Sequence, residues 1–408
     1  MACFYDLPSE LVEKIMLWAP ADSLVQFRFV NKFYHTLISS LIKDPEFVAK
    51  HLIIAKNKSL VSLLCFTNPS PNVDHRLATH PLLNIIYNDV ETNVLGTVVD
   101  TVTLPVFLKE GFNNVMYHCD GLLLLVNNHG RMMLCNPSLK ESVILPKPMN
   151  VGFEAYPNVG FELDSENNKY KCVAIWLGED ECQVGVYTVG SDHWREIKMS
   201  EDIVDAIADT QLCNGLCWGG VCYWMVVISD EAIFILSFDM SNDKFRLVNL
   251  PNFEALGVEE WALEEYSLRF AVWNDSVVLC LTPNGDNTSF IFMMKKDAAG
   301  ACSWTEYRQI GPLEKHYSHL LTFWKNNEIL MKVVGDDRSA FQLTSYNIGK
   351  QKLRNVVYDL DSNMNIFYNS VCFYVKSLIS VKVKSSRPPL KYVYTRRPKV
   401  AKLQRSDE

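Results

Sequence analysis

Apolar and polar positions follow two different rhythms along the chain. Over residues 6–52, apolar residues recur every three or four positions, the spacing that places them on one face of an α-helix. From residue 120 to residue 381, apolar stretches of five to eight residues alternate with polar turns that contain Gly or Asn. That alternation predicts many short antiparallel strands. We therefore expect a small helical module over residues 1–52 and a large all-β body over residues 53–381.

Three short helices are predicted in the first segment. Asp6, Asp22 and Asn31 are residue types that cap helix N-termini, and Pro20 ends the first helix. The pair Asp44–Pro45 opens a final helical turn. A unit below about 50 residues is marginal on its own, so part of the apolar surface of these helices must meet another surface.

A hairpin-like segment recurs in the body at nearly even spacing. Each copy has an apolar strand end, usually aromatic, then a turn and a second apolar residue. The copies begin at Leu134, Tyr187, Phe238, Phe292 and Tyr346, so successive starts are 53, 51, 54 and 54 residues apart. About 50 residues and four strands per unit is the period of β-propeller blades. We predict six blades, with seven as an alternative and a set of β-sandwiches as a competing fold.

The ring of blades has to close on itself. The last apolar stretch, residues 366–381, is predicted to pair with divergent strands between residues 61 and 107. Such a composite blade would complete a ring in which every sheet buries both faces against its neighbours and keeps only a short, protected edge.

Composition places the chain among globular proteins. Hydrophobic residues make up 48% and aromatic residues 12%, and no apolar run reaches the ~20 residues that cross a bilayer. We expect a cytoplasmic or nuclear location and no membrane association, since the first residues lack a secretory signal pattern. The 12 cysteines are scattered at low density, which favours reduced core thiols. Cys213, Cys217 and Cys222 lack the C-x2-C spacing of zinc sites, so a packed strand is the preferred interpretation.

Charge is distributed unevenly. Residues 382–408 hold nine Lys and Arg against two acids, a net of +7 that leaves about −15 on residues 1–381. An acidic body argues against nucleic acid as a ligand and favours a basic partner. The basic tail has prolines and no apolar periodicity, and we expect it to be a solvated, disordered end.

Within the helical segment the residues follow a recognisable motif. They are LP-x2-L-x3-I from Leu7, Pro20, then SL at 23–24, FR at 27–28, and DPEF at 44–47. This combination resembles an F-box, the trihelical module that binds the Skp adaptor of a cullin-RING ubiquitin ligase. Asn31 and Tyr34 depart mildly from the usual plant pattern, in which Cys or Ser and Trp are common. The residues that the resemblance assigns to the adaptor interface are Leu7, Pro8, Leu11, Val12, Ile15, Pro20, Leu24, Phe27, Val30, Tyr34 and Ile38.

The body carries motifs of its own. CDGLLLLVNNHGRMMLCNPSLKESVILP, VGFELDSENNKYKCVAIW and the ending FYVKSLISVK are similar to the plant F-box-associated domain. Within that group the motifs resemble S-locus F-box and S-locus F-box-like proteins. With the F-box, the resemblance extends over residues 7–384. It implies a substrate-recognition subunit of a Skp–cullin–F-box ligase, and for S-locus relatives it implies pistil S-ribonucleases as targets in pollen self-incompatibility.

No catalytic constellation is evident in the sequence. A Walker loop, a G-x-S-x-G elbow and an H-E-x-x-H helix are absent, so we expect neither enzyme activity nor a metal or cofactor. Two alternatives stay open: a general plant F-box receptor for another target, and a propeller binding module or enzyme whose helices are purely structural. Candidate substrate-binding acids are those of the stretch VEEWALEEY, namely Glu259, Glu260, Glu264 and Glu265.

Overall fold

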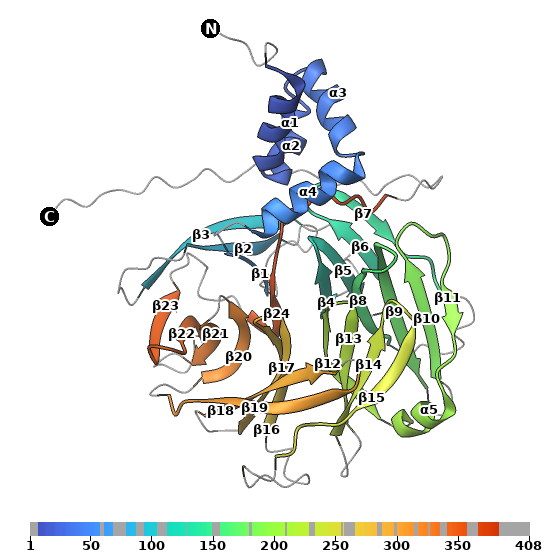
Figure 1. The fold of residues 1–408 in the computed structure, drawn as a ribbon, viewed down its shortest axis with the longest axis vertical. Coiled ribbons are helices and arrows are strands. Elements are labelled where there is room, and N and C mark those ends of the chain that lie inside the picture. Colours follow the sequence, from blue (N-terminus) through green and yellow to red (C-terminus); the bar gives the residue numbers. More distant parts are fainter. Residues whose placement is uncertain are drawn as a thin grey trace, which may run out of the picture.

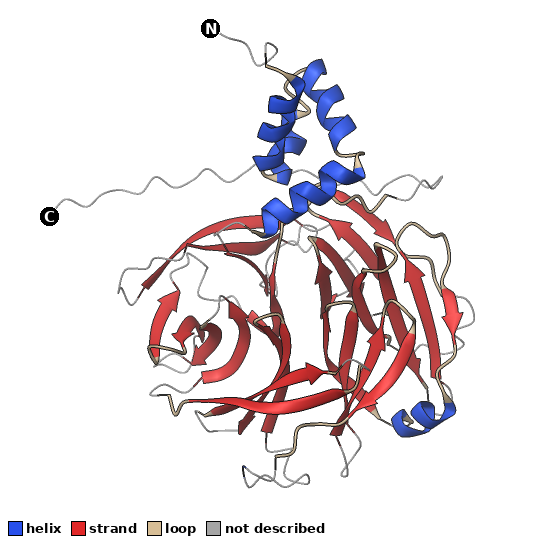
Figure 2. Cartoon of the chain, viewed as in Figure 1, coloured by secondary structure: helices blue, strands red, loops and turns tan. Residues whose placement is uncertain are grey.

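The fold is that of a computed structural model of the whole chain (Figure 1). It describes residues 7–57, 61–67, 79–86, 94–103, 112–127, 129–148, 156–178, 182–208, 210–227, 233–253, 256, 266–283, 288–297, 300–313, 317–324, 327–334, 341–356 and 366–382. Helices gather at the N-terminal end, and the rest of the described chain is almost all strand (Figure 2).

Four helices form the N-terminal module. They are α1 (Ser9–Trp18), α2 (Ala21–Phe27), α3 (Lys32–Leu41) and α4 (Pro45–Lys56). The predicted cap Asn31 is confirmed, because its side chain accepts a hydrogen bond of 3.0 Å from the Tyr34 amide. Asp22 was predicted as a cap and instead lies in the first turn of α2, which follows Pro20. Asp6 lies outside the described residues, and the predicted final turn is the 12-residue helix α4.

The interior of the helical module is apolar and closed. One face each of α1, α2 and α3 meets α4 around Phe47, which is 1% exposed. Leu378, from the far end of the chain, is also part of this cluster. The ring of His51 hydrogen-bonds the Ala19 carbonyl oxygen at 2.9 Å, which fixes the C-terminal end of α1 on α4. The module is therefore completed by a residue some 320 positions after its last helix.

The body is a ring of antiparallel four-stranded units. The four separate sheets are β4 (Phe112–Cys119), β5 (Leu122–Asn127), β6 (Met132–Asn136) and β7 (Glu141–Ile144); β8 (Asn158–Asp164), β9 (Lys169–Leu177), β10 (Cys182–Thr188) and β11 (Arg195–Ile197); β12 (Gln211–Trp218), β13 (Val221–Val227), β14 (Ile233–Asp239) and β15 (Lys244–Val248); and β16 (Tyr266–Trp273), β17 (Ser276–Pro283), β18 (Ser289–Lys296) and β19 (Cys302–Ile310). A short helix, α5 (Glu201–Ile207), follows β11.

A fifth sheet has eight strands and contains two such units. They are β20 (Tyr317–Trp324), β21 (Glu328–Val334), β22 (Phe341–Asn347) and β23 (Lys352–Val356), and then β24 (Ile366–Phe373) with β1 (Val61–Thr67), β2 (Thr79–Ile86) and β3 (Val94–Thr103). A short parallel pairing of β23 with β3, through Asn355 opposite Val94, merges the two units. The propeller therefore has five hydrogen-bonded sheets and six four-stranded units.

Closure of the ring follows the predicted composite blade. β24 pairs antiparallel with β1, with Leu63 opposite Phe373, so the C-terminal strand completes the sheet begun by the N-terminal strands. The innermost strands contact one another in a closed cycle, β4–β8–β12–β16–β20–β24 and back to β4. The all-β propeller prediction is confirmed.

The five copies of the recurring hairpin join the last two strands of five units, as predicted. Phe238 of β14 lies opposite Phe245 of β15, with ring centroids 4.7 Å apart. Tyr187 and Trp194 approach to 5.5 Å at the β10–β11 hairpin. Tyr346 of β22 likewise lies opposite Leu353 of β23, so the repeated apolar pair closes three of these hairpins.

A C-terminal strap, residues 374–382, holds the helices to the propeller. Lys376 Nζ lies 2.9 Å from an Asp22 carboxylate oxygen on α2 and 3.3 Å from one of Asp100 on β3. Asn136 Nδ2 donates to the carbonyl oxygens of Ser377 and Ile379, at 3.1 and 2.8 Å. The strap therefore bonds both parts of the molecule at once.

Gly121 provides a test of how tightly the strap is seated. Its φ is +82°, and a Cβ there would lie 2.2 Å from the Val375 carbonyl oxygen. Gly121→Ala is expected to lower the free energy of unfolding by about 1–3 kcal/mol more than Gly219→Ala. Gly219 is the matched control because its φ is +61° and nothing lies within 4 Å of its added Cβ. Thermal or denaturant unfolding of both variants measures the difference. Equal losses of unfolding free energy would show that the strap can shift away from an added Cβ without destabilising the protein.

The cysteines differ from the sequence expectation at one point. Cys217 and Cys222, directly opposite each other on β12 and β13, form a disulfide rather than two free thiols. The cross-strand register brings them together, and register is not visible in spacing alone. Eight further cysteines of the described chain are free.

None of the described helices is long and apolar enough to span a bilayer.

Candidate functional site

An exposed apolar face covers the outer side of the helical module. Twelve large apolar side chains are exposed among the described residues, and seven of them lie between Leu11 and Phe33. We call these seven the docking face: Leu11, Ile15, Trp18, Phe27, Phe29, Val30 and Phe33. An apolar cluster of this density on a small module is typical of a surface that another protein covers.

The pattern of α1 explains how one helix serves two surfaces. Leu11, Ile15 and Trp18 follow i, i+4, i+7 spacing and are 46%, 46% and 66% exposed. Val12 and Met16, on the opposite side, are 4% and 2% exposed and pack against the other helices. The helix is apolar on two sides because one side packs in the interior of the module and the other forms part of the docking face.

The residues predicted for the adaptor interface divide into three groups. Pro8, Leu11, Ile15, Pro20, Phe27 and Val30 are exposed, and Leu7 and Tyr34 are half-buried. Val12, Leu24 and Ile38 are at most 4% exposed and lie in the interior of the module. The adaptor interface stays a prediction for all eleven residues, and the burial of these three side chains is the point at which the structure offers no exposed surface for it.

Sequence reasoning missed three members of the docking face. Trp18, Phe29 and Phe33 are 66%, 81% and 39% exposed. Trp18 could have been found, since it continues the Leu11–Ile15 stripe by one further turn. Phe29 and Phe33 offer no periodic signal, because one lies in the turn between α2 and α3 and the other in the first turn of α3.

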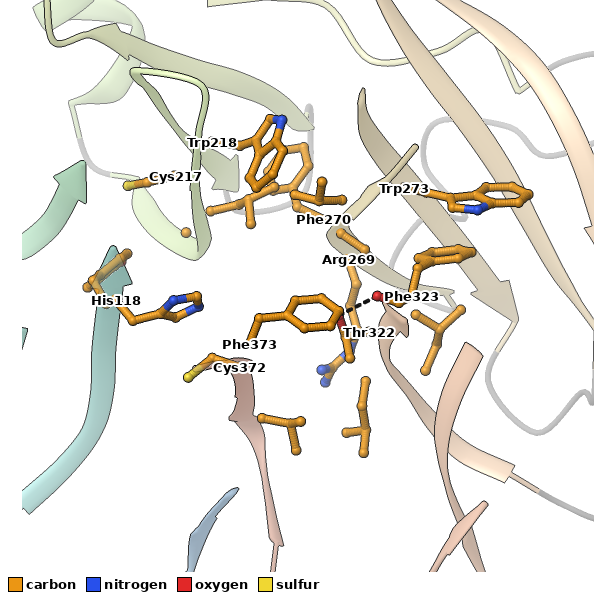
Figure 3. Close-up of a pocket in the computed structure, with 18 of the residues that line it drawn as sticks. His118, Cys217, Trp218, Arg269, Phe270, Trp273, Thr322, Phe323, Cys372 and Phe373 are labelled. Atoms are coloured by element: carbon orange, nitrogen blue, oxygen red, sulfur yellow. Dashed lines mark hydrogen bonds between the residues drawn. The ribbon is translucent and has the colours of Figure 1, made fainter. Parts of the chain in front are cut away.

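A second candidate site is a cavity at the centre of the propeller. A cavity of about 590 Å³ is lined by residues of five of the six inner strands, β4, β12, β16, β20 and β24. In Figure 3 the side chains of His118, Phe373 and Arg269 reach into it from β4, β24 and β16. The volume lies within the range of about 300–1,000 Å³ that is usual for ligand pockets.

Several aromatic side chains line this cavity. Trp273 and Phe323 stack with ring centroids 4.9 Å apart and an interplanar angle of 12°. Trp218 and Phe373 are 39% and 37% exposed, and the Trp218 indole donates to the Asp275 carbonyl oxygen at 3.3 Å. Stacked rings give the cavity a rigid side, and the half-exposed rings give it an apolar surface open to solvent.

Comparison with known proteins decides the family. A family model described as an F-box domain matches residues 4–45, and one described as an F-box associated beta propeller domain matches residues 91–381. The chain is an F-box protein with an F-box-associated propeller. Its F-box comprises the helices that carry the docking face, and the matched propeller ends with the strap.

Relatives of this F-box protein are found in Arabidopsis thaliana. An F-box/LRR-repeat/kelch-repeat protein is 25% identical over 392 residues, covering 92% of this chain and 98% of the relative. An F-box protein is 27% identical over 277 residues, 62% of this chain and 72% of the relative. An F-box only protein is 27% identical over 259 residues, 60% of this chain and 62% of the relative.

His118 gives the propeller of this F-box protein a pH-dependent stability. Burial lowers the pKa of His118 to about 4, against the opposing effect of Asp120. The unfolded chain therefore binds a proton near pH 6.5 that the folded chain binds only near pH 4. The stability linked to His118 is fully present above pH 6.5 and is lost as the pH falls toward 4.

His118→Gln is expected to flatten the stability profile between pH 6.5 and pH 4. The wild type should lose on the order of 2 kcal/mol more than the variant across that interval, a value reduced from the full pKa shift because the residue as a whole is half-buried. Denaturant unfolding at several pH values measures this. The matched control is His129→Gln, an exposed histidine in the β5–β6 turn, which should keep the wild-type profile. Parallel profiles for wild type and His118→Gln would contradict the assignment.

The free thiols of the F-box protein are suited to packing rather than to nucleophilic chemistry. Burial raises the pKa of Cys280 to about 12 and of Cys182 to about 11. The Cys119 thiol donates to the Glu162 carboxylate at 2.8 Å, and burial raises the pKa of both groups. A nucleophilic cysteine requires a lowered pKa, so these thiols stay protonated at neutral pH.

The predicted substrate-binding acids fall outside the described residues. Glu259, Glu260, Glu264 and Glu265 belong to residues 257–265, of which nothing is described. Their role as substrate contacts is a prediction.

Proposed function

We propose that this F-box protein is the substrate-recognition subunit of a Skp–cullin–F-box ubiquitin ligase. The observation that carries the proposal is the docking face, seven exposed apolar side chains on the F-box helices. The Skp adaptor would cover this face, and the propeller would hold the protein that is to be ubiquitylated. Membership of the F-box family and the paired domains of the chain support this role.

Such a receptor acts by proximity. A target held on the propeller has its lysines at high effective concentration near the charged ubiquitin-conjugating enzyme. The geometry between the two binding sites then matters more than any acid or base of this chain. The strap supports that geometry, because Lys376 and Leu378 tie the F-box helices to the strand that closes the propeller.

The target proposed by S-locus resemblance is a basic pistil ribonuclease. Residues 1–381 carry a formal charge of about −15, obtained as 30 basic minus 45 acidic residues, and such a body attracts basic proteins. At physiological salt the attraction is screened beyond about 8 Å, so it would speed encounter more than it would strengthen binding. A general plant receptor for another target is the alternative. Pollen-restricted expression favours the S-locus target, and broad expression in leaf and root favours the general receptor.

The competing function is a propeller binding module or enzyme with purely structural helices. Structural helices are expected to bury their apolar residues against the propeller. The exposure of Trp18 and Phe29, at 66% and 81%, favours a second protein as their partner instead.

The proposed function is tested by mixing the purified full chain with a plant Skp adaptor. Size-exclusion chromatography with light scattering is expected to give a one-to-one complex. Covering the docking face should also raise the thermal unfolding temperature of the chain. A folded, monodisperse chain that leaves the column separately from the adaptor would overturn the proposal.

A further inference from the structure

We propose that the Cys217–Cys222 disulfide is a site of reversible thiol–disulfide exchange with glutathione, and that its redox state controls the wall of the central cavity. The disulfide joins β12 to β13, and the cavity-lining residue Trp218 follows it directly. The inference rests on the proposed function, since it takes the propeller as the part that holds the target and the cytoplasm or nucleus as the compartment.

The oxidised pair differs from the other cysteines of the described chain. Eight of them are free, and burial raises the pKa of thiols such as Cys182 and Cys280, so these stay protonated. In the cytoplasm and nucleus glutathione keeps thiols reduced, and a disulfide that does occur there is usually transient and catalytic or redox-sensing. In the proposed compartment, a disulfide at Cys217 and Cys222 is therefore expected to be of the redox-sensing kind.

The two cysteines of the pair differ in how far solvent reaches them. Cys217 is half-buried and lines the central cavity. Cys222 is 0% exposed, and a Cβ added at Gly160 of the neighbouring sheet would lie 2.6 Å from its sulfur. Exchange requires attack on one sulfur only. Cys217 is thus the half of the pair that an incoming thiolate meets.

The exchange consists of two displacements at sulfur. A glutathione thiolate attacks the Cys217 sulfur, the bond to Cys222 breaks, and Cys222 leaves as a thiolate that takes up a proton. A second glutathione thiolate attacks the glutathione sulfur of the mixed disulfide and releases the Cys217 thiol. Two glutathione molecules are oxidised to glutathione disulfide, and the protein disulfide is reduced to two thiols. Glutathione disulfide drives the same steps in reverse.

Reduction is expected to loosen the end of the β12–β13 hairpin without unfolding the sheet. The disulfide closes a loop of only a few residues, so it restricts the unfolded chain less than a long-range disulfide would. β13 also stays paired with β14 from Val221 to Val227. The turn has room to shift, because a Cβ added at Gly219 would meet nothing within 4 Å.

Trp218 transmits the change to the cavity (Figure 3). It is 39% exposed, and its indole N–H donates to the Asp275 carbonyl oxygen of the next sheet at 3.3 Å. Trp273 and Trp324, the last residues of β16 and β20, are 3% and 0% exposed and are held by packing. Trp218 has less packing than these two, so its position depends more on the backbone of its hairpin, which the disulfide fixes.

The experiment incubates the full chain to equilibrium in buffers that run from glutathione disulfide to glutathione. Acid quenching, alkylation and mass spectrometry measure the redox state of the pair, and amide hydrogen exchange measures the hairpin. We expect reversible conversion within the series, with exchange of residues 216–222 roughly tenfold or more faster in the reduced form and unchanged exchange in β4–β7. Acrylamide quenching of tryptophan fluorescence should rise on reduction, and this rise should be absent from Trp218→Phe.

Two variants serve as references. The Cys217→Ala, Cys222→Ala double variant should show the fast exchange in every buffer. Cys213→Ala changes a half-buried free cysteine on the same strand and should respond as the wild type does. The redox series of the wild type tests the proposal independently of the folding of either variant.

The outcomes separate the redox site from the ligase role. A pair that stays oxidised in glutathione, or stays reduced in glutathione disulfide, would overturn the exchange proposal. Equal hydrogen exchange and equal quenching in the two states would overturn control of the cavity wall. Adaptor binding is measured on the same samples: its absence contradicts the ligase role, and its presence without a redox response contradicts the redox site alone.

Discussion

Exchanging Leu11 and Ile15 together for aspartate is expected to abolish binding to the Skp adaptor while the chain itself stays folded. Both side chains are 46% exposed and sit one helical turn apart in the α1 stripe. A carboxylate buried there on binding loses its hydration without gaining a partner, so the two changes together should cost roughly 3 kcal/mol or more of binding free energy. That is a loss of affinity of about 100-fold or greater, measurable by calorimetry or a pulldown.

The matched control for this variant is Leu247→Asp. Leu247 is 42% exposed on β15, a propeller strand that lies far from the F-box helices α1–α4 in Figure 1. It should leave adaptor affinity unchanged. If the double variant bound the adaptor as tightly as Leu247→Asp does, the docking face would be assigned to the wrong surface. If the double variant unfolded the propeller, the helices would be structural and the competing function would be favoured.

Leu378→Ala is expected to loosen the F-box while leaving most of the propeller intact. Leu378 is 1% exposed in the interior of the helical module, and removing a buried leucine side chain costs about 2–5 kcal/mol. Because the residue belongs to the strap, the loss should appear as faster amide hydrogen exchange in α1–α4 and unchanged exchange in β12–β15. Adaptor affinity should fall as a consequence.

A second substitution on the same strap, with a smaller expected loss of stability, serves as a comparison for Leu378→Ala. Lys376→Met removes partly exposed ion pairs to Asp22 and Asp100, at 2.9 and 3.3 Å, and should cost no more than about 1 kcal/mol. Uniformly faster exchange over helices and strands in Leu378→Ala would mean that the F-box and propeller unfold as one unit. Unchanged exchange in α1–α4 would show that the strap does not stabilise the helices.

The parts of the fold that the sequence predicted are those with a local signal. Phe238 and Phe245 face each other in one hairpin, and Tyr187 and Trp194 face each other in another. Each pair is close in sequence, so the repeated spacing is visible in the sequence itself. The same holds for Asn31, whose capping bond is made three residues away. These local signals led to the helical module and the propeller.

The parts of the fold and of the sites that the sequence did not predict depend on contacts between distant segments. Since α1 is apolar on two sides, its periodicity cannot tell that Val12 faces inward and Leu11 outward. Leu378 gives no local sign that it completes a helical module over 300 residues earlier. The cavity is assembled from five separate inner strands, and Trp218 differs from Trp273 only in what surrounds it.

One measurement tests the central claim that this chain bridges an adaptor to a target. Tagged wild type and the Leu11→Asp, Ile15→Asp double variant are purified from plant cells under proteasome inhibition, and ubiquitylated lysines of the co-purified proteins are quantified by mass spectrometry. We predict a protein that accompanies both forms and is ubiquitylated more heavily only with the wild type, which alone brings the Skp adaptor. Equal ubiquitylation with both forms, or a folded wild type that recovers no adaptor, would contradict the account.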